Sequence, residues 1–196
     1  MTPALAFEKF KLSSGKHVNF EDGACIMEMV SYFADEPWSD RPACACETLT
    51  NYAIRLNDRF DDETRQKLKP LIPLLINTRA DGGTRVLRSL FMVHRMLTVT
   101  FPIFTDALGL TEISARLRET KNETQSFRDI AEYLREKRPT IRKAAAATAA
   151  DADAYADADA AYASPAKKAK WKAVKDECNE SAIETLRLAC AIGKKE

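Results

Sequence analysis

Glycine is scarce in this chain of 196 residues, which contains only six. A turn-rich β-protein needs glycine at many positions of positive φ, so the scarcity argues against one. Histidine is scarcer still: His17 and His94 are the only two, which leaves few side chains able to act as a base near neutral pH. A glycine-rich phosphate loop is also missing, because the run Asp81–Thr84 lacks the lysine and the preceding strand that such a loop requires.

Neither sign of charge is in excess, and long apolar runs are missing. The net charge is +1 at pH 7, so no global field draws the chain to nucleic acid or to an anionic membrane. The first 17 residues lack the uninterrupted apolar core of a signal peptide, and no segment reads as long and apolar enough to span a bilayer. The cysteines number five, and without a secretion signal we expect free thiols in a reducing cytosol. The sequence therefore predicts a cytoplasmic protein that does not enter a membrane.

What the chain does contain is typical of a helical protein. Hydrophobic residues make up 45% of it, enough for a core, and alanine is abundant in the second half. We therefore predict an all-α fold, a compact helical bundle with an alanine-rich C-terminal helical hairpin. Residues 1–110 are expected to form a helical core domain. Residues 111–196 are expected to form a charged, alanine-rich helical region that packs on the core or on a partner.

The stretch Phe20–Phe60 organises the chain, because it predicts two helices joined by a loop. The first helix is indicated by an apolar stripe at i, i+3, i+4 and i+7, formed by Ile26, Met29, Val30 and Phe33. Pro37 disfavours helical geometry at the residue before it, so this helix is expected to end near Ala34. The loop Asp35–Pro42 then leads into the second helix. The two helices are expected to form an antiparallel hairpin, with Trp38 over its open end.

Later in the chain, proline divides the helical patterns. A third helix is expected to bend or break near Lys69, since Pro70 and Pro73 remove backbone hydrogen bonds. A fourth helix runs over Arg85–Thr98 and is expected to stop before Pro102. Further helices are expected over Thr111–Leu117, Ser126–Arg138, Ile141–Ala163 and Ala166–Ile192. Apolar positions on neighbouring helices are expected to meet in one core, which includes Ile26, Met29, Val30, Phe33, Leu49, Leu56, Leu90 and Leu97.

Two neighbouring segments carry a family resemblance: CIMEMVSYFADEPWSDRPAC, and then LNDRFDDETRQKLKPLIPLLINTRADG. They resemble a group of uncharacterised proteins of bacteria and their phages. Members share a Cys–x–Met–Glu run, a Glu–Pro–Trp–Ser–Asp loop, a Pro–x–Cys, and a Leu–Asn–Asp before a Leu–Ile–Pro. The resemblance covers residues 19–110 and weakens through the alanine-rich tail. It supports the helix boundaries and a phage or bacterial origin, and it implies no particular chemistry.

Cysteine and histidine form a candidate metal site. Zinc takes four nitrogen or sulfur donors in a tetrahedron, and these would be Cys25, Cys44, Cys46 and His17 if the hairpin brings its ends together. A single residue separates Cys44 from Cys46, whereas two is the usual spacing, and free cysteines are commonly buried in cores. Zinc and packed thiols are therefore both open readings. A third is a nucleophilic Cys25 with a pKa lowered at a helix N-terminus, which would need His17 or His94 as its base.

Charged side chains supply other candidates. Paired carboxylates for hydrolysis would come from the mouth of the hairpin, where Glu28, Asp40, Glu47 and Asp58 are expected to gather. Acids on helices are more often solvated or act as caps, so this chemistry is the less favoured reading. Arginines recur in one sector of the fourth helix. The candidate binding residues are therefore Glu28, Trp38, Asp40, Arg85, Arg88 and Arg95.

The tail carries blocks of opposite charge. One predicted helix ends in aspartates, and the next begins with lysines, so each block opposes its own helix dipole. Folding at Ser164–Pro165 would make the blocks face each other: Asp151, Asp153, Asp157 and Asp159 against Lys167, Lys168, Lys170 and Lys172. The lysines around Trp171 could bind the phosphates of a nucleic acid. Pairing with the aspartates would neutralise these lysines, so binding of nucleic acid is not favoured.

The sequence as a whole favours a binding protein. We expect a cytosolic helical protein of phage or bacterial origin that binds another macromolecule, either a protein partner or a second copy of itself, and that is not an enzyme. The alternative is a small enzyme or metal-binding protein, with zinc as its cofactor and a site at Cys25, Glu28 and the loop Trp38–Cys46.

Overall fold

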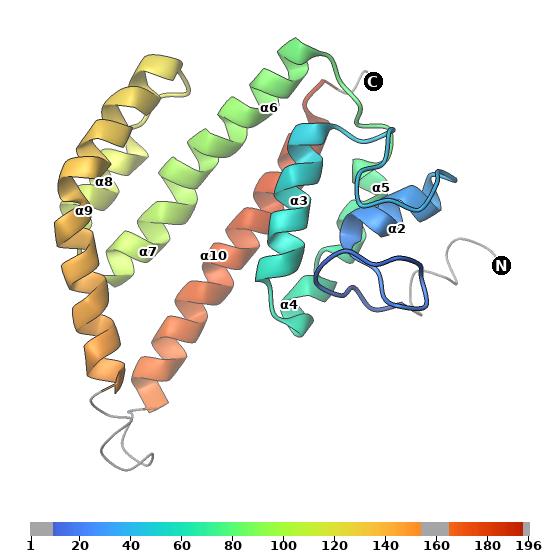
Figure 1. Ribbon diagram of the computed structural model, residues 1–196. Coiled ribbons are helices and arrows are strands. Elements are labelled where there is room, and N and C mark those ends of the chain that lie inside the picture. The colour runs from blue at the N-terminus through green and yellow to red at the C-terminus, as the bar shows by residue number, and fades with distance from the viewer. Residues whose placement is uncertain (1–9, 154–164, 194–196) are drawn as a thin grey trace. The chain divides into compact units, whose positions relative to one another are not determined.

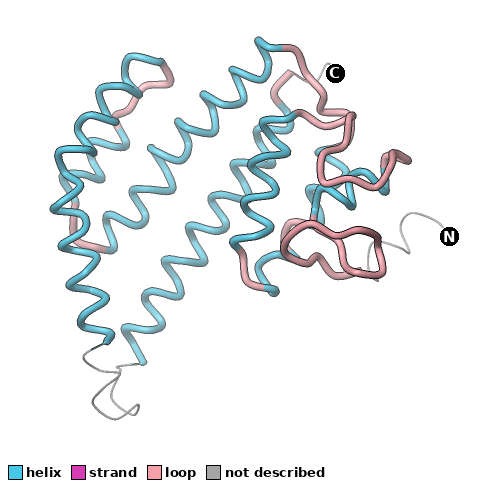
Figure 2. The backbone as a smooth tube through the Cα atoms, in the orientation of Figure 1, coloured by secondary structure: helices cyan, strands magenta, loops and turns pink. Residues whose placement is uncertain are grey.

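The protein is all-α, as the sequence predicts. The computed structural model describes residues 10–153 and 165–193, without the side chains of residues 148–153 and 165–168, and this part of the chain contains no strand (Figures 1 and 2). The chain divides into two units. Unit 1 comprises Met1–Met92 and Ala182–Glu196, and unit 2 comprises Val93–Ser181. This division differs from the expected one at residue 110, because two long helices contribute residues to both units.

Unit 1 is built from short helices. Its elements are α2 (Ile26–Phe33), α3 (Glu47–Arg59), α4 (Asp62–Gln66), a 3-10 turn (Lys69–Leu71), α5 (Ile72–Leu75), the first part of α6 (Gly82–Arg95) and the end of α10 (Pro165–Ala191). The predicted break near Lys69 is confirmed. Pro70 and Pro73 each fall in the first turn of an element, where a missing N–H leaves no hydrogen bond unmade.

Helix α2 ends where the sequence predicts, at Ala34, but through a different cause. Asp35 adopts a left-handed conformation with φ 55°. Its N–H donates to the Tyr32 carbonyl at 3.3 Å, and the N–H of Glu36 donates to the Ser31 carbonyl at 3.0 Å. These two bonds form a Schellman motif, which satisfies carbonyls that the helix end would otherwise leave unpaired. The helix therefore stops before Pro37 exerts any effect.

The core of unit 1 lies where α2 packs against α3 and α5. The predicted stripe is confirmed there, since Ile26, Met29, Val30, Leu49 and Leu56 are buried and Phe33 packs against them. The prediction of a single core is wrong. Leu97 belongs to a separate cluster in unit 2, and Leu90 is only half-buried. Periodicity assigned both to the core face of one helix, but that helix runs through both units.

Two adjacent leucines of α5 provide a matched test of this core. Leu75 is 0% exposed, whereas Leu74 is 37% exposed. Leu75→Ala is expected to lower the free energy of unfolding by about 3 kcal/mol, because it removes buried methyl groups and leaves a cavity. Leu74→Ala, the control, is expected to lower it by only about 1 kcal/mol, because much of that side chain already contacts solvent. Urea unfolding followed by circular dichroism measures both, and equal losses would contradict the assigned faces.

Unit 2 consists of longer helices. Its elements are the end of α6, a π-helical segment (Met96–Thr100), α7 (Phe101–Ala107), α8 (Thr111–Arg118), α9 (Thr124–Asp153) and most of α10. The predicted stop at Pro102 is wrong. This residue has no N–H for the carbonyl four residues earlier, and the chain widens so that the Phe101 N–H donates to the Met96 carbonyl five residues back. Helix α6 therefore continues directly into α7.

The continuous helix Gly82–Ala107 corrects a second expectation. By length and composition alone it is long and apolar enough to cross a membrane, with a mean hydropathy of 1.2 over 18 residues. Two of its apolar side chains, Val86 and Leu87, are more than half exposed. The expectation that no segment is long and apolar enough to span a bilayer is therefore wrong. The core helix of a soluble protein meets the same criterion, so the helix does not assign a compartment.

The core of unit 2 is small. It contains Leu97, Ile113, Leu117 and Ile130, and the hydroxyls of Thr105 and Ser114 pair at 2.6 Å beside it. Helix α9 runs through Pro139, so the predicted break there is wrong. Pro139 is exposed, and water can bind the carbonyl that loses its donor. The alanines after residue 143 then favour continuation of the helix.

The predicted charge pairing of the tail lies mostly outside the described residues. Among the lysines concerned, Lys170 and Lys172 are those whose side chains are described. Lys170 donates to the Ala107 carbonyl at 3.2 Å, and Lys172 pairs with Asp176 at 2.8 Å. The pairing of the aspartate and lysine blocks stays a prediction.

Candidate functional site

Glu28 is the centre of a buried hydrogen-bond cluster at the start of α2. Its side chain is 0% exposed. It accepts from the Cys25 N–H at 2.7 Å and from the His17 N–H at 2.6 Å, and it pairs with His17 Nδ1 at 2.9 Å. The Glu28 N–H donates in return to Cys25 Sγ at 3.4 Å, which completes a capping box. Glu28 thus holds the preceding loop against α2, and its side chain is enclosed by the protein.

Trp38 and Asp40 fix the next loop to the same place. Trp38 Nε1 donates to the His17 carbonyl at 3.0 Å, and its ring meets Phe20 edge-on with centroids 6.2 Å apart. Asp40 pairs with Lys16 at 3.5 Å. Trp38 therefore covers the cluster around Glu28, as expected for the open end of the hairpin, and the hydrogen bond that its indole N–H donates holds it there.

The structure does not bring the four predicted carboxylates together. Glu28 is buried in the capping box, and Asp40 faces Lys16. Glu47 pairs with Arg85, and Asp58 accepts from the Gly15 N–H at 2.8 Å, so the four serve separate local roles.

The thiol of Cys25 is not activated at the helix N-terminus. Burial raises the pKa of the Cys25 thiol to about 12, the amide of Glu28 lowers the pKa by less, and the Glu28 carboxylate adds a further increase. This corrects the reading of Cys25 as a thiolate nucleophile, since a group with such a pKa stays protonated near pH 7.

The same shift gives a pH dependence that can be measured. The folded pKa of about 12 lies above the ordinary value of 9.0, so the contribution of Cys25 to stability is full below pH 9 and declines as the pH rises toward 12. At pH 10 this loss is about 1 kcal/mol. Cys25→Ser keeps a capping oxygen but does not titrate. Between pH 8 and pH 10 the unfolding free energy of wild type should therefore fall by that amount more than the unfolding free energy of the variant. Equal declines in the two proteins would contradict the assignment.

The proposed zinc ligands are divided between two places. His17 and Cys25 both contact Glu28, whereas the Cys44 N–H donates to Glu36 at 2.8 Å and the Cys46 N–H donates to Thr78 Oγ1 at 3.1 Å. Among the described residues, no three histidine, cysteine, aspartate or glutamate side chains are placed to hold a metal ion. Zinc binding stays a prediction, and elemental analysis of protein purified without chelator measures it.

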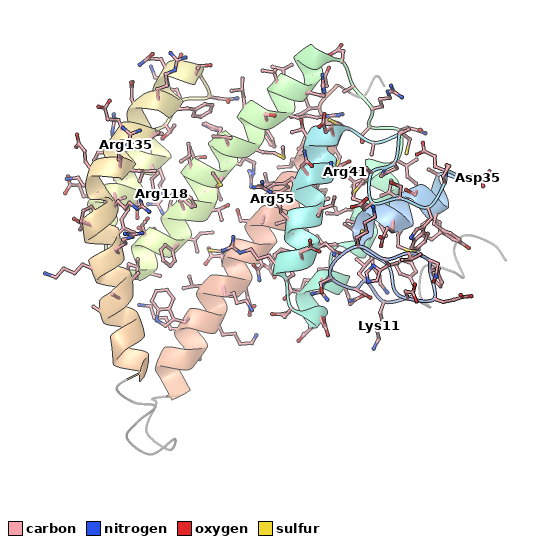
Figure 3. All side chains as sticks on the ribbon, viewed as in Figure 1. Lys11, Asp35, Arg41, Arg55, Arg118 and Arg135 are labelled. Carbon is pink, nitrogen blue, oxygen red and sulfur yellow. The ribbon has the colours of Figure 1, made fainter. Side chains whose placement is uncertain are left out.

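A pocket of about 500 Å³ opens at the start of α3, within unit 1. We call it the arginine pocket, and its lining is Arg41, Pro42, Ala43, Ala45, Cys46, Glu47, Thr50, Arg79, Ala80 and Arg85. The arginines come from three places in the chain: the loop before α3, the loop before α6, and α6 itself. Figure 3 labels Arg41. Of the predicted binding residues, only Arg85 lines this pocket.

Hydrogen bonds hold the two loops of the arginine pocket in place. The carboxylate of Glu36 accepts from the Ala43 N–H at 2.6 Å and from the Cys44 N–H at 2.8 Å, which fixes the loop before α3. The N–H of Arg79 donates to the Cys44 carbonyl at 2.8 Å, which joins the second loop to the first. Hydrogen bonds made by backbone groups therefore fix both loops that line the pocket.

The guanidinium groups of the pocket are only partly paired. Arg85 Nη1 lies 3.2 Å from Glu47 Oε2, and Arg41 Nη1 donates to Asn51 Oδ1 at 3.0 Å. The Arg79 side chain makes no hydrogen bond or ion pair with the described residues. Three arginines and one glutamate give the lining a formal charge of +2, which is three positive charges minus one negative charge. Such a lining attracts anions.

A buried arginine, Arg88, lies next to Cys46 of the pocket lining. Arg88 is 2% exposed, and it donates to the Thr78 carbonyl at 2.6 Å and to the Ile192 carbonyl at 2.7 and 3.1 Å. The sequence placed Arg88 with Arg85 and Arg95 in one binding sector, but Arg88 faces the interior and Arg95 is half-buried in unit 2.

Cys46, the N-cap of α3, lies in the pocket lining and is 1% exposed. Burial raises the pKa of the Cys46 thiol, but the amides of Leu49 and Thr48 and the Arg88 guanidinium lower it by more. The net pKa of the Cys46 thiol lies below its ordinary value, because these amides and the Arg88 cation favour the thiolate. Cys46 thus lies in an environment that favours negative charge.

Sequence reasoning missed Arg41 and Arg79, because both lie in loops that carry no periodic signal. Their meeting depends on contacts between segments more than 30 residues apart, such as Cys46 with Thr78. Compared with family models, with curated proteins and with solved structures, the chain matches none.

Proposed function

We propose that the protein acts by binding another protein, and that an anionic group of this partner enters the arginine pocket. The observation that supports the proposal is that Arg41, Arg79 and Arg85 line one pocket that contains a single carboxylate. Arginine side chains present planar forks of N–H donors that match acidic groups, and arginine clusters are a recurring means of recognising acidic motifs.

Binding fits this pocket better than catalysis does. General acid–base chemistry requires a positioned group that accepts or releases a proton. In the described lining only the Glu47 carboxylate and the Cys46 thiol have this capacity, and Glu47 is paired with Arg85. The free cysteines of the chain fit a reducing cytoplasm as the compartment where the partner is met.

A protein partner fits better than nucleic acid. A nucleic-acid backbone presents phosphates at regular intervals and is bound by an extended basic surface. At this site three arginines line one pocket, Glu47 lies among them, and the chain as a whole carries a net charge of only +1. Recognition of a single acidic group on a protein surface matches this distribution.

The test compares proteins captured from lysate of the source cells by three forms of the full chain. Wild type and Arg55→Ser, which removes an exposed arginine on α3 outside the pocket lining, should retain the same partner. Arg79→Ser should lose it. Identical capture by all three forms, or capture of nothing by wild type, would contradict the proposal. Light scattering on the purified protein shows whether the partner is a second copy.

A further inference from the structure

We infer that the group bound in the arginine pocket is a dianionic phosphoryl group, carried by a phosphorylated serine, threonine or tyrosine of the partner protein. This inference rests on the proposed function and adds the chemical class of the ligand. It follows from the charge of the pocket, from the number of donors that remain unpaired, and from the place of Glu47 among the arginines.

The charge of the lining matches a dianion. Its formal charge of +2 includes Glu47, the carboxylate that the pocket already holds. A phosphomonoester carries close to two negative charges near pH 7, so it neutralises the remaining excess. A carboxylate group carries one negative charge and would leave a net charge of +1 on the lining.

The guanidinium groups of the pocket have more unpaired N–H donors than one carboxylate group can accept. Each guanidinium carries five N–H donors. One Arg85 nitrogen faces Glu47, one Arg41 nitrogen faces Asn51, and the Arg79 side chain has no partner in the described part of the chain. A carboxylate offers two oxygens, whereas a phosphoryl group offers three strong acceptors that arginines from three directions can share.

Glu47 makes the pocket selective. Its Oε2 lies 3.2 Å from Arg85 Nη1, so an entering anion competes with an acceptor that is tethered next to Arg85. A carboxylate that displaced Glu47 would exchange one carboxylate–guanidinium contact for an equivalent one, with little gain. A dianion gains more from the same exchange, because its second charge also engages Arg41 and Arg79. Glu47 therefore disfavours aspartate and glutamate side chains as ligands.

The size of the pocket suits such a side chain. A volume of about 500 Å³ exceeds what a single phosphate group fills, which leaves room for the side chain that carries it. Pro42, Ala43, Ala45 and Ala80 line the pocket with apolar surface that can contact this part of the ligand.

The experiment measures binding of small probes to the full chain by isothermal titration calorimetry at pH 7.5. The probes are inorganic phosphate, phenyl phosphate as the dianionic monoester, methyl phenyl phosphate as the monoanionic diester, and benzoate as the carboxylate. Phenyl phosphate is expected to bind about tenfold more tightly than the diester or benzoate, which corresponds to one additional charge-assisted contact. Arg79→Ser should weaken phenyl phosphate about tenfold, and Arg55→Ser should leave it unchanged.

Glu47→Gln tests whether the Glu47 carboxylate causes the preference for a phosphate monoester over a carboxylate. Without the competing carboxylate, benzoate should gain more affinity than phenyl phosphate does, so the preference for the monoester should narrow. Circular dichroism must show that each variant is as folded as wild type.

The outcomes distinguish this inference from the proposed function. If benzoate binds as tightly as phenyl phosphate, or if no probe binds while partner capture still depends on Arg79, the phosphoryl inference is wrong and the proposed function stands. If the diester binds as tightly as the monoester, the ligand is the backbone of a nucleic acid and both proposals are wrong. Both are also wrong if no probe binds and capture does not depend on Arg79.

Discussion

Replacing Glu28 with alanine is expected to lower the free energy of unfolding by about 5 kcal/mol, enough to unfold much of the protein at room temperature. The substitution leaves three donors without an acceptor: the Cys25 N–H, the His17 N–H and His17 Nδ1. Each unsatisfied buried donor costs about 1–3 kcal/mol. The capping box of α2 is lost as well, and the loop around His17 loses its main attachment.

Two other variants show whether the hydrogen bonds of Glu28 are the cause. Glu28→Gln keeps one acceptor oxygen and adds an amide that faces donors, so it should cost about 2 kcal/mol. Glu21→Ala removes an exposed acid shortly before α2 and should change stability by less than about 0.5 kcal/mol. Urea unfolding followed by circular dichroism ranks the three. A loss below about 1 kcal/mol for Glu28→Ala would show that water replaces the carboxylate in this cluster.

The elements that could be predicted are those whose determinants lie close together in sequence. The α2 stripe repeats within eight residues, and the break near Lys69 follows from Pro70 and Pro73 themselves. Even the Glu28 cluster carries a local signal. The spacing Cys25–x–x–Glu28 is that of a capping box with cysteine in place of serine, and it predicts a structural role for Glu28.

Helix ends predicted from proline are wrong where neighbouring groups compensate for the hydrogen bond that proline cannot make. Pro102 was expected to end a helix, but a π-helical segment supplies a hydrogen bond from the Phe101 N–H. Pro139 was expected to break one, but it is exposed and alanines follow it. Propensity gives the local cost of such a residue, and it does not show which neighbouring groups compensate.

The arginine pocket could not be predicted, because it depends on contacts between two loops. Gly23 illustrates the same limit in the other cluster. Its φ is 124°, and an added Cβ would lie 2.8 Å from the His17 ring, yet nothing around it in the sequence marks this contact. In both places the deciding contacts join residues that are distant in sequence or lie outside any helix.

Arg88→Met is expected to lower the free energy of unfolding by about 4 kcal/mol. Methionine fills most of the volume but leaves the Thr78 and Ile192 carbonyls without donors. The variant also removes a buried cation, which relieves a desolvation penalty and makes the net loss smaller than the sum of the lost bonds. Because Ile192 follows the last turn of α10, the end of that helix should become the first part of unit 1 to exchange amide hydrogens.

Arg88→Lys separates the charge of the side chain from its geometry. Lysine keeps the cation but has no fork to join two carbonyls, so it should cost about 2 kcal/mol and leave the pKa of the Cys46 thiol below its ordinary value. Arg88→Met should raise that pKa, because the cation that lowers it is gone. The rate at which Cys46 reacts with a disulfide reagent at pH 7.5 reports the difference, with Cys46→Ser as the blank. If both variants retained wild-type stability and Cys46 reactivity, Arg88 would neither stabilise unit 1 nor lower the pKa of Cys46, and the position of Thr78 beside Cys46 would need another cause.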